Sequence, residues 1–600
     1  MNSDRNTKQI FDEKLAKADA ELENLAQSSQ KLSSFRLVAF IAIIILASLS
    51  SFGGYMSFWW TALPLGLFVF AILRHDKILR KEEQQKWIKE FYEDGIKRLT
   101  NQWQGNGIHE ADFSDENHLY SRDLDIFGKG SLFELICTAQ TASGERQLAR
   151  WLMAPSKRNE IDARQKAVQE LTEELQLRED IAVAARRMRS LLNPARLNEW
   201  ALCAPQISER RFFWFRILFF LLGAAAIAAI VSCFFTDFGL AILAGVGIVE
   251  WIIGRILKPQ LSPVLLGVEG PRRQLKVMSD ILARYEKQSV ESPLLKELKA
   301  GLFVHEVPAS KATSHLGHLV DWLDQSRNQV FAPVAFLLMW SGHFALSIEK
   351  WRLEFGRHIP EWLEASGNLE ALCSLAGFAF EHPHYAWPNI VDGSPRFEGT
   401  ALGHPLLSEE ECVCNSISLS EAPQLWLVSG SNMSGKSTFL RIVGINAVLA
   451  MAGGPVFGTS LTLTPFAIGS TIRVLDSLQK GRSKFYAEIS TLKQIVELTQ
   501  GEYPLLFLLD EIFHGTNSHD RTIGARAVIS ELVARGALGL VTTHDLALTK
   551  MADELGDNAR NVHFDDMVKD GLLSFDYTLK EGPVTRSNAL ELMRSVGLNV

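Results

Sequence analysis

The sequence predicts an α/β domain with an open parallel sheet, placed after mostly α-helical segments and combined with two apolar helical hairpins. Three observations lead to this fold class. A glycine-rich loop at 430–438 lies between a short apolar run and a helical pattern. A second short apolar run, 505–509, ends in two acids. Two further stretches, 37–73 and 217–257, are almost free of charge and long enough to cross a bilayer.

The loop fits the phosphate-binding pattern G-x-x-x-x-G-K-[ST] and has the neighbours that this pattern requires. An apolar run, 425–428, predicts the strand before it, and residues 439–443 predict the helix after it. Backbone N–H groups at such a helix start bind phosphate oxygens. We therefore expect nucleotide binding by Gly430, Ser431, Asn432, Met433, Ser434, Gly435, Lys436, Ser437 and Thr438, with Lys436 on the β- and γ-phosphates and Ser437 on Mg²⁺.

Two later strands end in side chains that suit hydrolysis of a nucleotide. Asp510 and Glu511 follow the apolar run at 505–509, and ligands of open α/β sheets bind at that edge. Asp510 is the expected Mg²⁺ partner, and Glu511 is the expected base for the attacking water. In isolation, two acids after a strand could equally cap a helix. His544 follows the strand at 538–541 and is the candidate sensor of the γ-phosphate, although a lone His is more often structural.

A second anion site is predicted at Ser483. Apolar residues at 489, 492, 495 and 496 have helical spacing, which places Ser483 at a helix start. Such a position attracts anions, but within one chain it is too far from the loop to serve the same nucleotide. We therefore expect a homodimer in which each chain supplies Ser483 to the nucleotide site of the other.

The apolar stretches predict an integral membrane protein. Residues 37–73 suit two spans with a turn near Gly53, and 217–235 with 238–257 suit a second hairpin. Lys and Arg flank both hairpins and are missing from their turns, so both termini and the α/β domain are expected in the cytoplasm, with a bacterial inner or plasma membrane as the bilayer. Glu250 is expected near the inner interface, paired with Arg255, or as a functional intramembrane carboxylate. The apolar run 330–340 is too short to span and is expected in a buried core.

These features divide the chain of 600 residues into seven segments. The net charge of −8 argues against bulk electrostatic capture of nucleic acid, and the six scattered cysteines indicate free thiols in a reducing compartment. The expected segments are a helical arm (1–35), a first hairpin (36–74), a connector (75–130), a helical part (131–211), a second hairpin (212–257), a second helical part (258–400) and the α/β domain (401–600).

Several of these motifs together resemble the MutS family of ATPases. The residues involved are Ser431 to Thr438, Asp510-Glu511-Ile512 with Gly515-Thr516-Asn517, Thr543-His544, the stretch Arg473, Asp476 and Ser483, Gly403 to Leu406, Ser587 to Gly597, and, upstream, Ser131 to Leu135 with Gly144, Arg146, Leu148 and Trp151-Leu152. The resemblance covers about 131–205 and 258–600. It implies a MutS/ABC-type P-loop ATPase that uses ATP and Mg²⁺, dimerises, and binds mismatched or structured DNA as mismatch-repair proteins do, with an unknown membrane or repair partner.

The sequence also departs from the family pattern. Ser431 stands where the family usually has Pro, Phe513-His514 replaces Gly-Arg, and Cys412 falls near the expected adenine-stacking aromatic. No mismatch-reading domain is expected ahead of the helical core. Two other functions therefore stay open: an ATP-driven membrane switch without a DNA role, and an ABC-like transport component. Gly481 to Lys484 stands in place of a Leu-Ser-Gly-Gly stretch, which argues against transport.

Overall fold

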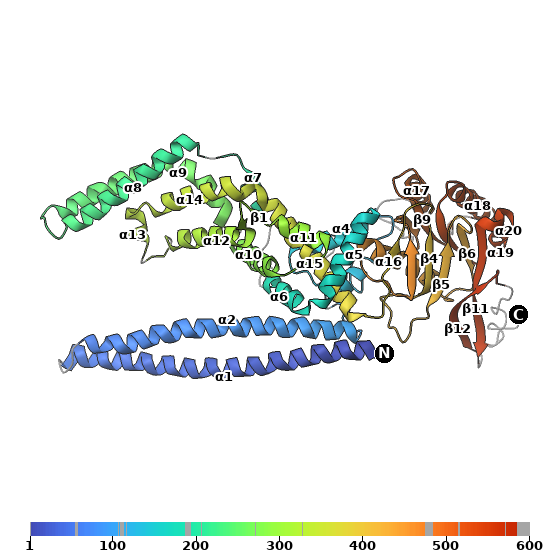
Figure 1. The fold of residues 1–600 in the computed structure, drawn as a ribbon, viewed down its shortest axis with the longest axis horizontal. Coiled ribbons are helices and arrows are strands. Elements are labelled where there is room, and N and C mark those ends of the chain that lie inside the picture. Colours follow the sequence, from blue (N-terminus) through green and yellow to red (C-terminus); the bar gives the residue numbers. More distant parts are fainter. Residues whose placement is uncertain are drawn as a thin grey trace. The chain divides into compact units, whose positions relative to one another are not determined.

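The computed structural model describes residues 2–53, 58–105, 107, 113, 115, 117–186, 194–205, 207–269, 272–326, 328–329, 331–473, 484–513, 517–569 and 572–584. The chain forms two compact units (Figure 1). The first contains residues 1–106 with 380–384, and the second contains 107–379 with 385–600.

The first unit is built on two long helices that pack along each other. They are α1 (Asn2–Gly53) and α2 (Ala62–Leu99), joined through η1 (Phe58–Thr61). Phe11 is buried between them, with its ring centroid 5.5 Å from that of Tyr92 and 5.7 Å from that of Phe380. A Cβ at Gly95 would lie 2.6 Å from the Phe11 ring, so the glycine allows the helices to approach. The expected arm (1–35) and the first half of the expected hairpin thus form one continuous helix.

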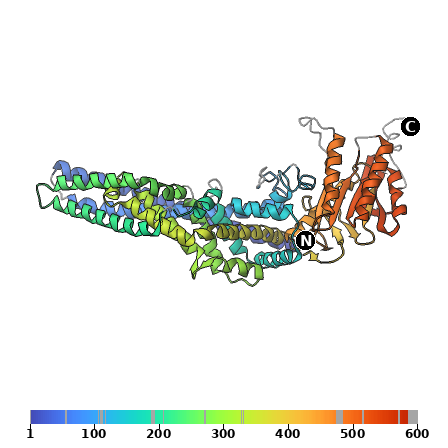
Figure 2. The same ribbon diagram turned by 90° about the horizontal axis from the view of Figure 1, so that it is seen from above.

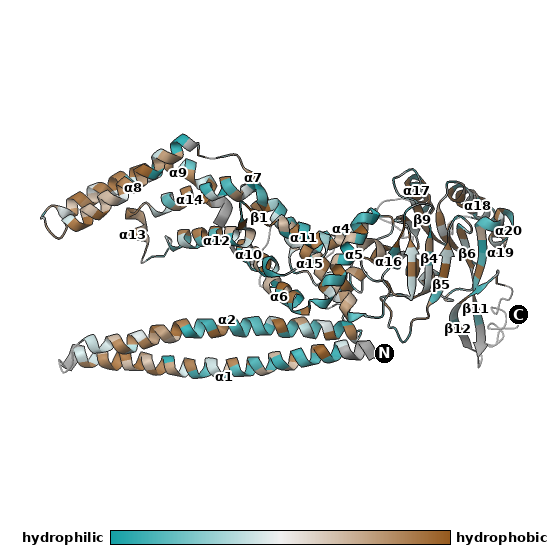
Figure 3. Cartoon of the chain, in the orientation of Figure 1, coloured by the Kyte–Doolittle hydropathy of each residue, from teal (hydrophilic) through white to brown (hydrophobic). Residues whose placement is uncertain are grey.

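Three helices in the described part of the chain are long and apolar enough to cross a membrane: Thr7–Ser50, Arg210–Ser232 and Gly239–Leu265. Figure 3 shows apolar residues along α8 and α9 and at the ends of α1 and α2 nearest η1. The two hairpins predict four such segments. The fourth predicted segment is the start of α2, where the apolar run covers only residues 62–73 and ends at Arg74. This run is shorter than the apolar stretches of the other three helices.

The second unit begins with a mostly helical region, as expected. Thr141 caps α4 by accepting from the Gly144 N–H at 3.2 Å, and Ser131 caps α3 by accepting from the Glu134 N–H at 3.2 Å. The elements are α3 (Leu132–Ile136), α4 (Ala142–Met153), α5 (Arg158–Glu173), α6 (Leu175–Arg186), α7 (Pro194–Leu202), α8 (Glu209–Ser232), α9 (Gly239–Glu269), α10 (Arg272–Lys287), α11 (Pro293–Ala300), β1 (Phe303–Val304), β2 (Val307–Pro308), α12 (Ala309–Gln325), α13 (Ala332–Leu337), α14 (Trp340–Phe355), η3 (Gly356–His358) and α15 (Ile359–Glu381).

Two predictions about the apolar segments were wrong. The run 330–340 is not a buried core, because Val334 and Phe336 are exposed while Ala335 and Met339 are buried. Its helix α13 contacts α8 and α9, and Val334 and Phe336 on its outer face are exposed among the described residues.

The second error is the expected snorkelling of Glu250 or its pairing with Arg255; the alternative, a functional intramembrane carboxylate, stays a prediction. This side chain is fully buried, and neither of its carboxylate oxygens has a hydrogen-bond partner among the described residues. The Arg255 guanidinium lies instead 5.7 Å from the ring centre of Trp251. Stacking on the neighbouring indole is available to Arg255 from its own helix turn and takes the place of the expected ion pair.

The α/β part contains a six-stranded sheet with the order β12-β11-β6-β10-β9-β8. All neighbouring pairs are parallel except β12 with β11. A smaller sheet has the order β3-β7-β4-β5. The strands are β3 (Asn389–Ile390), β4 (Phe397–Leu402), β5 (Asn415–Leu419), β6 (Leu425–Ser429), β7 (Ser460–Leu463), β8 (Ala467–Thr471), β9 (Leu505–Asp510), β10 (Leu538–Thr543), β11 (Ala559–Lys569) and β12 (Leu572–Glu581).

Helices cover both faces of the six-stranded sheet (Figures 1 and 2). One face packs against α17 (Lys484–Leu498), α18 (Ser518–Ala534), α19 (Leu546–Thr549) and α20 (Met551–Leu555), which is followed by η5 (Gly556–Asn558). The other face packs against α16 (Lys436–Ala452), where a Cβ at Gly444 would lie 2.7 Å from the Leu508 side chain. Strands β6, β9 and β10 are therefore buried on both faces, and this explains their unbroken apolar runs.

Candidate nucleotide site

The loop between β6 and α16 has the backbone that phosphate binding requires. Gly430 and Gly435 have φ values of 151° and 105°, in a region that only glycine adopts without strain. A Cβ at Gly430 would lie 2.8 Å from the Ser434 Oγ and 2.9 Å from the Phe564 carbonyl oxygen. The hydroxyls of Ser431 and Ser434 are buried and have no hydrogen-bond partner among the described residues. These two unsatisfied hydroxyls suit an anion with several oxygens.

The loop lysine is held inside the loop. Lys436 is buried, and its Nζ donates to the carbonyl oxygens of Gly430 at 2.9 Å and Ser431 at 2.8 Å. Its Nζ also lies 3.4 Å from Oε1 of Glu511. Lys436 is thus positioned at the first turn of α16, where the helix dipole and the ammonium group both favour a phosphate.

Asp510 lies beside the loop, as the sequence predicts. Ser437 Oγ donates to Oδ2 of Asp510 at 2.6 Å, and Thr542 Oγ1 at the end of β10 donates to Oδ1. A hydroxyl and a carboxylate at this distance fit Mg²⁺, a cation that takes few protein ligands and completes its shell with water and phosphate oxygens. In the described part of the chain no group of three or more His, Cys, Asp and Glu side chains surrounds a metal position.

Glu511 and His544 form the third part of the site. The Glu511 N–H donates to Thr542 Oγ1 at 3.0 Å, and Glu511 has a left-handed φ of 46°. Its Oε2 lies 3.4 Å from Nδ1 of His544. A non-glycine residue held in this region costs on the order of 1–3 kcal/mol and marks a functional constraint. The fold therefore brings Lys436, Asp510, Glu511 and His544 to one edge of the sheet.

A pocket of about 490 Å³ opens over the loop and contains residues that no motif indicated. Tyr577 of β12 lines it, and a Cβ at Gly435 would lie 3.1 Å from the Tyr577 ring. Asn415 holds this strand in place, because its Nδ2 donates to the Tyr577 carbonyl at 2.9 Å and its Oδ1 accepts from the Leu579 N–H at 2.8 Å. Cys412 also lines the pocket, as expected. The antiparallel pairing of β12 with β11 brings Tyr577 to the loop, and local sequence carries no signal for it.

Ser483, Asp476, His514, Gly515, Thr516 and the stretch 587–597 lie outside the described residues. The helix that follows Ser483 is nevertheless tied to the site. Buried Glu488 of α17 accepts a hydrogen bond from the Phe513 N–H, and the Phe513 ring centroid lies 6.1 Å from that of Phe485. Phe513 has a φ of 63°. This explains why glycine is the usual residue at that place in the family pattern.

A segment before the helical region also packs on the α/β part. The carboxylate of Asp123 accepts from Ser470 Oγ at 2.8 Å and from the N–H groups of Ile472 at 2.7 Å and Arg473 at 3.1 Å. Burial raises the pKa of Asp123 above its usual value. Arg473 donates to both oxygens of Asp125, at 2.7 and 2.9 Å. The end of the expected connector (75–130) thus forms part of the site's support.

Two segments of the chain are similar to known proteins. The family model for MutS domain V matches residues 426–599, and that for MutS domain III matches residues 118–199. The chain is 30% identical over 240 residues to the DNA mismatch repair protein MutS of Streptococcus uberis, covering 39% of this chain and 28% of that protein. It is 33% identical over 239 residues to the DNA mismatch repair protein MutS 2 of Halobacterium salinarum, covering 39% of this chain and 27% of that protein. The chain thus spans little more than a quarter of the length of these relatives.

Proposed function

The chain belongs to the MutS family, and from that membership we propose that it binds and hydrolyses ATP in the pocket over the 430–438 loop. One observation supports this most strongly. Lys436 and Ser437 at the start of α16, Asp510 and Glu511 at the end of β9, and His544 after β10 converge at one edge of the sheet. This is the set of groups that phosphoryl transfer to water needs.

Each group has a role that follows from its position. The loop N–H groups and Lys436 bind the β- and γ-phosphates, and the buried Ser431 and Ser434 hydroxyls, which have no partner among the described residues, donate to phosphate oxygens. Ser437 and Asp510 would hold Mg²⁺, which neutralises charge on the phosphates. Glu511 takes the proton of the attacking water, and His544, 3.4 Å away, orients that carboxylate. Tyr577 supplies the aromatic face for the adenine that Cys412 cannot provide.

The site works in a homodimer in this proposal. Glu488 and Phe485 fix the start of α17 against the segment that follows Glu511. Movement of that segment on ATP binding therefore moves the start of α17, next to Ser483. Ser483 of one chain contacts the nucleotide of its partner, and ATP then controls how the two chains associate.

The chain is also proposed to be anchored in a membrane, with the ATP site in the cytoplasm. Support comes from the three long apolar helices and from the Lys and Arg residues that flank the hairpins. Resistance of the full chain to alkaline carbonate extraction from membranes tests this part. Release into the soluble fraction would contradict it.

DNA is the proposed ligand at the level of the family, because the relatives carry the name of DNA mismatch repair proteins. The net charge of −8 favours the second candidate, an ATP-driven membrane switch without a DNA role. Binding of duplex, mismatched and branched DNA, with and without ATP and across a salt titration, separates the two. Binding that depends on ATP and on DNA structure supports the first, whereas weak binding that only follows salt supports the second.

Lys436→Ala tests the ATP site itself, with Lys493→Ala as the matched control. Lys493 is 75% exposed on α17 and pairs only with Glu497 in the described part of the chain. Binding of a fluorescent ATP analogue should weaken by at least about tenfold in Lys436→Ala, because the buried ammonium that contacts phosphate is lost. Equal affinity in both variants would overturn the assignment of the loop.

A further inference from the structure

A second pocket, of about 390 Å³, lies where the second apolar hairpin begins. We call it the hairpin-base pocket; α8, α12 and α14 form its walls. Arg216 of α8 lines it and directly precedes the uncharged run 217–235. The pocket is therefore at the level where lipid headgroups lie if α8 crosses a bilayer.

The walls of the hairpin-base pocket are held together by close packing. A Cβ at Gly342 of α14 would lie 2.7 Å from the Phe219 ring of α8, so the glycine lets these helices touch. Trp351 Nε1 of α14 donates to the Ala312 carbonyl of α12 at 2.8 Å. Leu346, which lines the pocket, belongs to one buried cluster with Phe219, Leu257 and Leu261. The side chains that line it therefore project from fixed elements.

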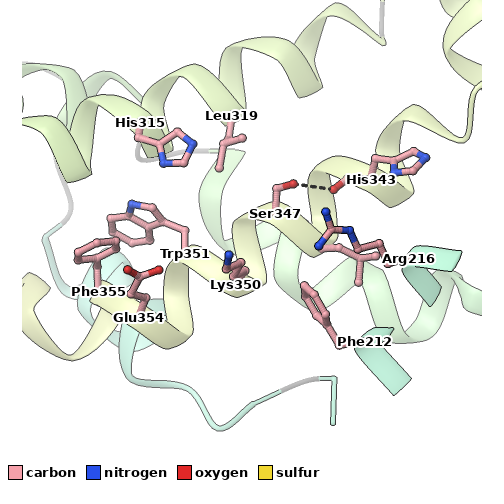
Figure 4. A pocket seen from close by; sticks show the side chains of 11 residues that line it. Phe212, Arg216, His315, Leu319, His343, Ser347, Lys350, Trp351, Glu354 and Phe355 are labelled. Atoms are coloured by element: carbon pink, nitrogen blue, oxygen red, sulfur yellow. Dashed lines mark hydrogen bonds between the residues drawn. The ribbon is translucent and has the colours of Figure 1, made fainter. Parts of the chain in front are cut away.

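The charged side chains of the lining are mostly cationic. Figure 4 shows Arg216 and Lys350 projecting from two different helices along the same pocket. Neither forms an ion pair or a hydrogen bond within the part of the chain that the structure describes, and the same holds for Glu354, the only acid of the lining. His315 and His343 add ring nitrogens, and burial lowers the pKa of His343. Two cations and two imidazoles against one carboxylate favour an anion.

Apolar surface adjoins these cations. Phe212 and Trp351 line the pocket itself, and the neighbouring Phe213 and Trp214 on α8 are both exposed. Exposed Val334 and Phe336 of α13 continue the apolar surface along the hairpin. An inorganic anion would use only the charges, whereas a phospholipid matches both the charges and the aromatic rim.

We propose that the hairpin-base pocket binds the phosphate of an anionic glycerophospholipid, with Arg216 and Lys350 on the phosphate and the aromatic side chains on the glycerol and acyl region. This inference rests on the proposed membrane anchoring. It assigns a specific lipid contact to the base of the second hairpin, which belongs to the same compact unit as the proposed ATP site.

The test uses the full chain in neutral detergent, with native mass spectrometry of bound lipid. Phosphatidylglycerol, phosphatidylcholine and inorganic phosphate serve as separate probes. The pocket variant is Arg216→Gln with Lys350→Gln, and the matched control is Arg211→Gln with Lys311→Gln. The control residues are exposed on α8 and α12, remove the same charge, and do not line the pocket. Lys350→Gln alone replaces the double variant if the latter unfolds at a lower temperature than wild type.

We expect the pocket variant to lose about tenfold or more in phosphatidylglycerol affinity, while the control stays within about twofold. Phosphatidylcholine should bind equally to all three proteins, and excess inorganic phosphate should not displace phosphatidylglycerol. Equal losses in both variants would show general surface attraction and overturn the proposal. Displacement by inorganic phosphate would show a free-phosphate site and also overturn it. If carbonate releases the chain from membranes and only the pocket variant loses phosphatidylglycerol affinity, the membrane anchoring is rejected and the headgroup site is supported.

Discussion

Replacement of Glu511 by Gln separates ATP binding from ATP hydrolysis. Glu511 lies 3.4 Å from the Lys436 Nζ on one side and 3.4 Å from the His544 Nδ1 on the other, and its side chain is only 20% exposed. Gln keeps the shape of the side chain but cannot accept a proton from water. A positioned general base contributes about 10²- to 10⁴-fold, so the turnover number should fall by about a thousandfold, which corresponds to about 4 kcal/mol in the barrier.

ATP affinity should not fall in the same variant. The substitution removes the negative charge that lies 3.4 Å from the Lys436 Nζ, so we expect the ammonium to contact the nucleotide at least as well as in wild type. Equilibrium binding of ATP and steady-state release of phosphate, measured on the same preparation, separate the two quantities. Glu497→Gln is the control, because Glu497 is an exposed acid of α17 that pairs with Lys493 at 3.6 Å. Turnover within about threefold of wild type in Glu511→Gln would refute the assignment of the base.

Three further predictions concern other parts of the structure. Tyr577→Ala should weaken ATP binding by about tenfold or more in a fluorescent-nucleotide titration, while Tyr577→Phe, which keeps the ring, should not. An equal loss of ATP affinity in both variants would reject stacking. Buried Glu370 has its pKa raised to about 6 by burial, from 4.5. It therefore binds more protons folded than unfolded, and stability should fall by about 2 kcal/mol in total as pH rises from well below 4.5 to well above 6. Urea unfolding across that range should show this step in wild type and not in Glu370→Gln. Glu250→Gln should keep or raise the melting temperature in detergent, because the buried carboxylate has no partner among the described residues; a marked drop would reveal a required charge.

The geometry of the candidate nucleotide site was largely predictable because its residues follow strand ends. Ser437 and Asp510 are far apart in sequence, yet parallel strands β6 and β9 flank β10 and end at one edge, so their hydroxyl and carboxylate meet at 2.6 Å. His544 was placed by the same reasoning at the end of β10. Motif spacing and strand polarity together determine this part of the geometry.

Other contacts between residues far apart in the sequence could not be predicted. Tyr577 reaches the pocket only because β12 pairs antiparallel with β11, and Asp123 supports the site from a segment that precedes the helical region. No local pattern marks either contact. The apolar run 330–340 was misassigned because hydropathy alone does not distinguish burial in protein from a surface that lies along the hairpin. The continuous α1 was missed because a change in composition near residue 36 does not interrupt a helix.

The most direct test of the account is ATP hydrolysis measured on membranes after carbonate extraction. Membranes that contain the wild-type chain and membranes that contain Glu511→Gln are compared at equal amounts of protein. The account predicts that the wild-type chain stays in the pellet and hydrolyses ATP, while the variant stays in the pellet and is inactive. Activity that leaves with the soluble fraction, or that is the same in both pellets, would contradict a membrane-anchored ATPase with its base at Glu511.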